Sequence, residues 1–276
     1  MIAIPKEFRP LTEPVYQEAS VGEWRIIKRP YGKNIRQRKR CVGYWSNDSV
    51  VKSRYSWTLF KEERVWMSLT PMELESQGYH ARLAHGRVVV AGLGMGAVVS
   101  TLLTNPRVSH ITVIEQDAHV IELLKKSAVW FTESPRLEIE NMNALDYVPA
   151  ITPDTFIADI WPMLGADEAV TQMKLMQANI EAKTIGWWGQ EIDLVTHLKN
   201  KGYHPPITVE HIKEFEQFMG VPLIGASHPR YKDMVLAAVL TLSGVVLSKS
   251  AAKGDREAQF ALNQIDALNA LGGMLL

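Results

Sequence analysis

The segment Arg87–Ser100 most constrains the fold of this chain, because its sequence, RVVVAGLGMGAVVS, changes character twice. A run of apolar residues leads into Gly92, Gly94 and Gly96, and the chain then becomes apolar again. Such a run predicts a strand buried in a parallel sheet, and the glycines predict a sharp turn into a helix. A turn of this kind leaves main-chain N–H groups and a helix N-terminus accessible to a ligand.

Strand and helix patterns alternate after this loop, which predicts a parallel α/β sheet with helices on both faces. We expect further strands at residues 111–115, 137–140, 156–160 and 183–188, and helices at 97–103, 118–128, 167–182 and 190–199. The tail is predicted to be helical, at residues 209–219, 231–247 and 255–271.

The first 80 residues have a different pattern, rich in β-branched and aromatic residues between turn formers, which predicts an antiparallel sheet. Its expected strands are residues 24–29, 42–46, 50–60 and 64–69. Thr70 as N-cap and Pro71 at the first helical position then predict a helix. The chain thus divides into a β-rich region at 1–69, a core with the glycine loop at 70–200, and a helical extension at 201–276.

Composition limits the partners. The chain has 30 basic and 30 acidic residues, so no overall field favours nucleic acid or a membrane surface. The basic cluster in Lys28–Arg40 is a candidate contact for nucleic acid, although we favour a solvated loop. The longest apolar run, Met234–Ser248, is shorter than the roughly 20 residues that span a bilayer, so we expect a buried helix. With one cysteine, Cys41, and no apolar leader, a cytoplasmic protein is expected.

A carboxylate follows the second predicted strand, at the tip of the stretch ITVIEQD. Glu115, with Gln116 beside it, lies about 20 residues beyond the glycines. This is the spacing at which an acidic side chain accepts hydrogen bonds from ribose hydroxyls. The glycine loop alone is a weak sign of a ligand, and the carboxylate strengthens the case for a nucleotide or nucleoside.

Asn143 and Ala144 follow the third predicted strand and help to choose between two ligands. A polar side chain there can bond the adenine amino group, and a small neighbour leaves space for the ring, as in enzymes that bind S-adenosylmethionine (SAM). Gly92, Gly94 and Ala97 also satisfy the G-x-G-x-x-G/A pattern of dinucleotide binders, which keeps NAD(P) open. No Arg or Lys of the loop is placed to bind a pyrophosphate, so SAM is the expected cofactor.

A family resemblance becomes specific at this point. The stretch GRVVVAGLGMGAVVSTLLTNPRVSHITVIEQDAHVIEL resembles the core of spermidine synthases and of the wider class I SAM-dependent methyltransferase superfamily. The likeness covers roughly residues 65–192 and implies a Rossmann-like parallel sheet of the methyltransferase type. The positions that it assigns to the cofactor are Gly92, Gly94, Gly96, Glu115 and Asn143, the last in place of the family's usual Asp.

The resemblance also aligns Asp159, at the end of the fourth predicted strand, with the catalytic Asp of the aminopropyltransferases. Asp159 is therefore the candidate general base or amine-orienting group, and a candidate cofactor contact. Trp161, two residues on, is a candidate ring to stack on adenine or cover the acceptor. The alternatives are local N–H bonding for Asp159 and core packing for Trp161.

Two departures from the family bear on the reaction. Met95 stands where the family's glycine loop has Asp, and the run Asp159–Pro162 lacks the family's second acid. Both missing carboxylates would help to hold a cationic amine, so we favour a SAM-dependent methyltransferase of spermidine synthase-like type with an unknown acceptor. Aminopropyl transfer from decarboxylated SAM is the alternative, and it would need other carboxylates, such as Glu73, Glu75 or Asp117.

A non-catalytic module that keeps the fold and uses its tryptophans or C-terminal helices for assembly is a further alternative. The apolar helical tail also suggests self-association. The eight histidines have no metal-ligand spacing with Cys or acids, so no metal site is expected. No G-x-S-x-G nucleophile motif occurs either.

Overall fold

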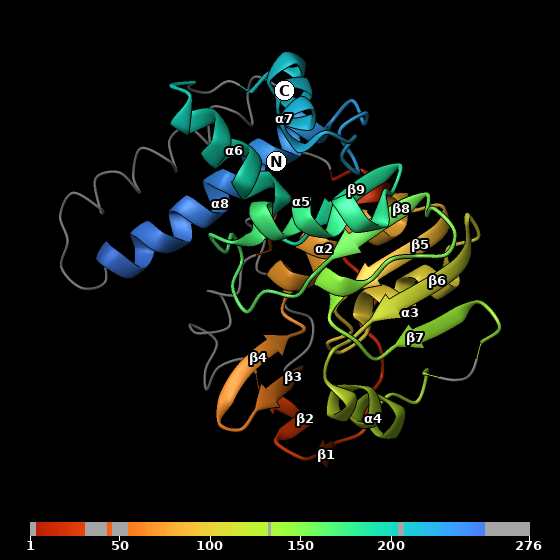
Figure 1. The fold of residues 1–276 in the computed structure, drawn as a ribbon. Helices are drawn as coiled ribbons and strands as arrows, with labels where there is room; N and C mark the ends of the chain where they lie inside the picture. Colours follow the sequence, from red (N-terminus) through yellow and green to blue (C-terminus); the bar gives the residue numbers. More distant parts are fainter. Residues whose placement is uncertain (1–3, 31–42, 46–54, 132–133, 204–206, 252–276) are drawn as a thin grey trace.

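The computed structural model describes residues 4–30, 43–45, 55–131, 134–203 and 207–251 (Figure 1). The helix expected at 255–271 and residues 31–40 of the basic cluster lie outside this range. The described residues form two sheets, one antiparallel and one parallel, with helices around them.

The parallel sheet confirms the expected α/β fold with Rossmann-like connections. Its strands are β5 (Gly86–Ala91), β6 (Val108–Ile114), β7 (Leu137–Glu140), β8 (Thr155–Ala158) and β9 (Thr184–Trp187). They lie in the order β7-β6-β5-β8-β9, and each neighbouring pair is parallel. The strand order reverses at β5, between β6 and β8, so a crevice opens at the carboxyl ends of these three strands.

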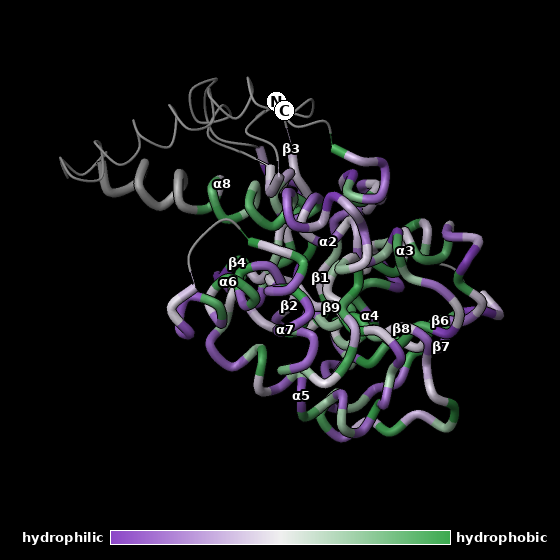
Figure 2. Tube along the Cα trace, turned by 90° about the horizontal axis from the view of Figure 1, so that it is seen from above, coloured by the Kyte–Doolittle hydropathy of each residue, from purple (hydrophilic) through white to green (hydrophobic). Residues whose placement is uncertain are grey.

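The connections between these strands agree closely with the sequence pattern. They contain α3 (Ala97–Thr104), α4 (Ala118–Ser127), the short 3-10 helix η2 (Ala144–Asp146) and α5 (Ala169–Ile180), and α6 (Gln190–Asn200) follows β9. Figure 2 shows hydrophobic residues along α3, β6 and β8, whereas the outer loops are largely hydrophilic. The three central strands of the sheet are buried from Val88 of β5, Ile111 of β6 and Thr155 of β8 to their carboxyl ends, as the apolar runs predict.

The antiparallel sheet comes from the N-terminal region and lies beside α4 (Figure 1). Its strands are β1 (Ala19–Val21), β2 (Trp24–Pro30), β3 (Tyr55–Lys61) and β4 (Arg64–Ser68), preceded by the short 3-10 helix η1 (Lys6–Phe8). They pair in sequence order. Residues of this sheet line one side of the crevice at the carboxyl ends of the parallel strands.

One expected strand is wrong. Residues 43–45 form no strand, and all three are buried. The main-chain N–H groups of Tyr44 and Trp45 donate to Oε2 of Glu75, at 2.7 and 2.9 Å, rather than to a neighbouring strand. A side-chain carboxylate therefore satisfies the polar groups that strand pairing would otherwise satisfy.

Helix α2 (Pro71–Leu83) starts as the sequence predicts. Thr70 is the N-cap, its hydroxyl accepts from the N–H of Glu73 at 3.4 Å, and Pro71 opens the helix. The helix follows directly on β4, and Glu73 lies in its first turn. The cap thereby fixes where the side chain of Glu73 projects.

The C-terminal helices α7 (Val209–Met219) and α8 (Tyr231–Ala251) confirm two of the tail predictions. They gather with α6 at the end of the molecule away from the antiparallel sheet (Figure 1). Beyond the last strand, Leu223 makes a single parallel bridge to Ile185 of β9. Within the described ranges, no helix combines the length and apolarity needed to cross a membrane.

Candidate functional site

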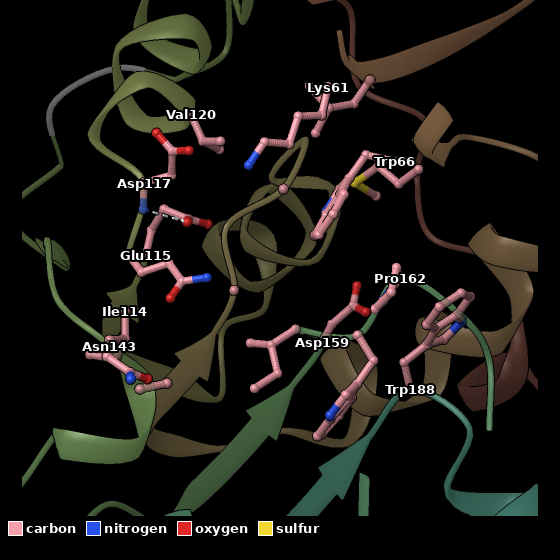
Figure 3. A pocket seen from close by; sticks show the side chains of 18 of the residues that line it. Lys61, Trp66, Ile114, Glu115, Asp117, Val120, Asn143, Asp159, Pro162 and Trp188 are labelled. Atoms are coloured by element: carbon pink, nitrogen blue, oxygen red, sulfur yellow. Dashed lines mark hydrogen bonds between the residues drawn. The ribbon is translucent and has the colours of Figure 1, made fainter. Parts of the chain in front are cut away.

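A cleft of about 670 Å³ opens at the carboxyl ends of β5, β6 and β8 (Figure 3). Glu115, Asp117 and Asn143 lie on one side of it, and Trp66, Asp159, Pro162 and Trp188 lie on the other. The residues predicted from the sequence that line the cleft are Gly92, Gly94, Glu115, Gln116, Asn143, Ala144, Asp159 and Trp161. The fold thus brings together the glycine loop after β5 and side chains from the ends of β6, β7 and β8.

The glycine loop approaches its neighbours too closely for side chains. Gly92 has φ +92°, and a Cβ there would lie 2.2 Å from the carbonyl oxygen of Asp159. Gly96 has φ +70°, but a Cβ there would meet the indole of Trp130 at 2.7 Å, and this glycine does not line the cleft. Gly92 and Gly94 therefore shape the floor of the cleft, whereas Gly96 leaves room for the side chains of Trp130 and Leu124.

Glu115 is held rigidly at the end of β6. Its Oε2 accepts from the N–H of Leu93 in the glycine loop at 3.0 Å, and its Oε1 accepts from the N–H of Asp117 at 2.9 Å. A carboxylate has about four acceptor positions, so each oxygen retains one for a ligand. The arrangement ties the carboxylate to the loop and presents it to hydroxyl donors in the cleft.

Asn143 and Ala144 lie just beyond β7, at the start of η2. The side-chain oxygen of Asn143 caps η2 by accepting from the N–H of Leu145 at 3.0 Å. That oxygen has a second lone pair, and the amide nitrogen is a donor, so both remain usable by a heterocycle. Ala144 is buried and leaves space beside them.

Asp159 follows β8 at the opposite wall. Its Oδ2 accepts from Nε2 of Gln77, on α2, at 2.8 Å. Burial raises the pKa of Asp159 from 3.8 to about 7, against a smaller lowering by the Gln77 bond. The carboxyl is therefore poised to gain or lose a proton near neutral pH.

Glu73 lines the cleft with Asp159 and is a second acid there, which the run Asp159–Pro162 after β8 does not supply. Its Oε2 accepts from the N–H of Ser68 at 3.0 Å. Burial first, and the charge of Asp159 second, raise the pKa of Glu73 to about 8. Of the other carboxylates considered from the sequence, Asp117 lines the cleft, whereas Glu75 is buried outside it.

The tryptophans divide between the cleft and the core. Trp161 lines the cleft but is 5% exposed, and its Nε1 donates to Oε1 of Gln172 at 2.8 Å. Trp188 also lines the cleft, and its Nε1 donates to Oγ of Ser76 at 2.8 Å. Trp187 is fully buried.

Sequence reasoning missed the contribution of the antiparallel sheet. Trp24, Leu59, Lys61, Trp66 and Met67 all line the cleft. Trp24 is tied to the far wall, because its Nε1 donates to Oδ2 of Asp117 at 2.8 Å. Lys61 and Trp66 lie on one hairpin, and this pairing of a cation with an aromatic ring could have indicated a ligand-facing surface. No sequence pattern within the hairpin, however, specifies where the hairpin packs on the rest of the protein.

Met95, which replaces the acid of the resembling family's loop, belongs to the core. Its side chain is fully buried. Its N–H contacts Sδ of Met67 at 3.2 Å, and its carbonyl accepts from the hydroxyl of Tyr16 at 2.6 Å. The glycine loop thus carries no charge of its own, and the N-terminal region braces it.

Comparisons with known proteins give partial likenesses. No protein-family model and no curated protein matches the sequence. Among solved structures, a spermidine synthase from Thermotoga maritima is 16% identical, with 65% of this chain and 64% of that chain covered and a TM-score of 0.37. An N-methyltransferase from Bradyrhizobium japonicum, in complex with S-adenosyl-L-homocysteine, is 17% identical, with 40% and 56% covered and a TM-score of 0.31.

An amino pentose methyltransferase from Micromonospora echinaspora, with SAM bound, is 18% identical, with 36% of this chain and 40% of that chain covered and a TM-score of 0.27. This chain therefore spans less than two thirds of the length of each of these three structures. The fold assignment itself follows from the strand order and the parallel pairing of the sheet.

Proposed function

We propose that this protein binds SAM and transfers its methyl group to an acceptor held near Asp159. The observation that carries the proposal is Glu115, whose carboxylate is fixed to the glycine loop by the 3.0 Å bond from Leu93, at the floor of a cleft that Asp159 faces from the other side. A nucleoside fits this wall, because Glu115 offers acceptors to the ribose and Asn143 offers polar atoms to the adenine.

SAM supplies an electrophilic methyl group on a sulfonium, which an acceptor attacks in line. The protein's contribution is mainly to position the two partners, which can remove roughly 7–11 kcal/mol from a barrier. Gly92 and Gly94 allow the cofactor to lie against the main chain. Asp159 orients the acceptor and takes its proton where the nucleophile carries one. This role requires the carboxylate form of Asp159. Because burial raises its pKa to about 7, that form predominates only at pH values above neutral.

Methyl transfer fits the uncharged glycine loop. An acid in that loop would repel the carboxylate of the methionine moiety of SAM, whereas decarboxylated SAM has no carboxylate to repel. Met95 removes such an acid and places a thioether in the core instead. The absence of this charge supports SAM over its decarboxylated form.

Aminopropyl transfer is the second candidate, and one observation favours it. Glu73 stands beside Asp159 and provides the second carboxyl that the run Asp159–Pro162 after β8 lacks. The two candidates use the same cleft and differ in the cofactor. A non-catalytic module and an NAD(P)-binding protein are the remaining alternatives, and nucleic-acid contact through Lys28–Arg40 and self-association through the tail stay predictions.

Calorimetric titration with SAM, S-adenosylhomocysteine, decarboxylated SAM, methylthioadenosine and NAD tests the proposal. We expect micromolar binding of the first two, and a loss of at least a hundredfold in Glu115→Ala, since a charged acceptor contributes about 1.5–3 kcal/mol for each hydrogen bond to the ribose. The exposed Glu63→Ala is the matched control and should bind normally. Preference for decarboxylated SAM would favour aminopropyl transfer, and no binding of any of them would refute a nucleoside site.

A further inference from the structure

Two carboxyl groups share the wall of the cleft opposite Glu115. The protein anchors each of them through one oxygen, by Gln77 to Oδ2 of Asp159 at 2.8 Å and by Ser68 to Oε2 of Glu73 at 3.0 Å. Each carboxyl therefore keeps its second oxygen for a partner in the cleft. Burial first, and the charge of Asp159 second, disfavour the ionised form of Glu73, so a cation held between the two carboxyls would favour their ionised forms.

The described lining does not supply that charge. Lys61 is the sole lysine or arginine among the described residues that line the cleft. Its ammonium pairs with Oε1 of Glu23 at 2.9 Å and lies over the ring of Trp24, with Nζ at 5.1 Å from the ring centroid. A positive group on a ligand is the natural complement of Glu73 and Asp159.

Indole rings flank the same wall. Trp66 and Trp188 lie on the side of the cleft where Asp159 lies (Figure 3). Trp66 is 38% exposed and packs edge to face on Trp24, with ring centroids 5.4 Å apart. The N–H of Trp188 is used by Ser76. Contacts of this kind fix the rings and leave π surface for a flat, positively charged ligand.

We propose that this wall binds an aromatic amine, a flat ring with a protonated amino group on a short chain, as the acceptor of the transfer; the inference rests on the proposed function. The ammonium lies against Glu73 and Asp159, and the ring lies against Trp66 and Trp188. A linear diamine would leave the indole surfaces in water. Above pH 8, where both acids are ionised, they would repel an aromatic carboxylate.

The transfer then balances simply. The ammonium gives one proton to the carboxylate of Asp159, and the freed nitrogen lone pair attacks the methyl carbon of SAM. The N–CH₃ bond forms as the S–CH₃ bond breaks, and the sulfonium leaves as neutral S-adenosylhomocysteine. The positive charge moves to the methylated nitrogen, so the product is again a cation beside Glu73.

Calorimetry above pH 8, where Glu73 and Asp159 are both ionised, with tryptamine, 1,4-diaminobutane and indole-3-acetate, each with and without S-adenosylhomocysteine, tests this inference. We expect tryptamine to bind at least tenfold more tightly than the diamine, and no binding of the indole acid. Glu73→Gln should weaken tryptamine binding about tenfold, since a charge-assisted contact is lost. Trp66→Leu should weaken it about tenfold, and Trp66→Phe should restore most of the affinity. Glu63→Gln, with a side chain 87% exposed, is the charge-matched control and should bind like the wild type.

Equal or tighter binding of the diamine, or binding of indole-3-acetate, would overturn the inference. So would tryptamine affinity that survives both Glu73→Gln and Trp66→Leu in variants whose circular dichroism is native. If S-adenosylhomocysteine binds but tryptamine does not, the acceptor class is wrong and the cofactor proposal stands. If tryptamine binds as expected and S-adenosylhomocysteine does not, the proposed transfer fails and the amine site remains.

Discussion

Replacing Asp159 by asparagine should change how the stability of the fold depends on pH. Burial raises the pKa of this carboxyl from 3.8, its value in the unfolded chain, to about 7. Below pH 3.8 it is protonated in both states and contributes no pH dependence. As pH rises from there to about 7, the unfolded chain releases the proton while the folded protein holds it, so stability present at low pH is lost.

The size of this effect follows from linkage. Each pH unit in the window lowers the free energy of unfolding by about 1.4 kcal/mol. Between pH 5 and pH 7 the wild type should therefore lose about 2 kcal/mol through Asp159, and Asp159→Asn should not lose it. Glu73, whose pKa is raised to about 8 by burial and, second, by the charge of Asp159, adds a loss of the same sign that is smaller in Asp159→Asn. The comparison between the two proteins therefore reports Asp159 together with its effect on Glu73, and both widen the difference in the same direction.

Urea unfolding at pH 5 and pH 7 measures the difference, with the exposed Asp146→Asn as control. The gap in unfolding free energy between Asp159→Asn and the wild type should widen by about 2 kcal/mol at the higher pH. Asp146→Asn should follow the wild type at both pH values. If the gap for Asp159→Asn stays constant within about 0.5 kcal/mol, Asp159 is hydrated in the folded protein and its assignment as a poised base is wrong.

Three further substitutions test the loop and its supports. Gly92→Ala should prevent folding or cofactor binding, seen by circular dichroism and calorimetry, because a Cβ at φ +92° would lie 2.2 Å from the Asp159 carbonyl oxygen. A native fold with normal binding would contradict the loop geometry. Thr70→Ala should cost about 1 kcal/mol in urea unfolding, with Thr70→Ser nearly neutral, and equal losses would rule out the cap. Tyr16→Phe should cost about 1 kcal/mol by removing the 2.6 Å bond to Met95, and no loss would mean that this bond does not brace the loop.

The sequence predicts the central sheet well because its signals are local. The apolar runs before Gly92 and Glu115 identify β5 and β6, and the period of the helices places each crossover within a few residues. Parallel strands align their carboxyl ends, so Glu115, Asn143 and Asp159 can be predicted to meet at one edge of the sheet before any side-chain contact is known. The main wall positions of the cleft could therefore be named in advance.

The rest of the site depends on long-range packing. Gly96 belongs to the same motif as Gly92, yet it accommodates Trp130 rather than the cleft, and no spacing rule separates the two roles. Tyr44 lies in an apparent strand, but Glu75 captures its N–H. Trp66 looks like an ordinary strand residue until the hairpin docks over the crevice. Tertiary contacts decide each of these outcomes.

The bonds that complete the cleft also have a consequence for folding. Tyr16 reaches Met95 across 79 residues of sequence, Gln77 reaches Asp159 across 82, and Trp24 reaches Asp117 across 93. Contacts so distant along the chain form late, because a large loop must close before any of them is gained. If the first 70 residues folded before the rest, the antiparallel sheet would be present without the parallel sheet that completes the cleft. We therefore expect ligand affinity to appear only at the last step of folding, so the rate at which binding recovers during refolding measures the rate of that step.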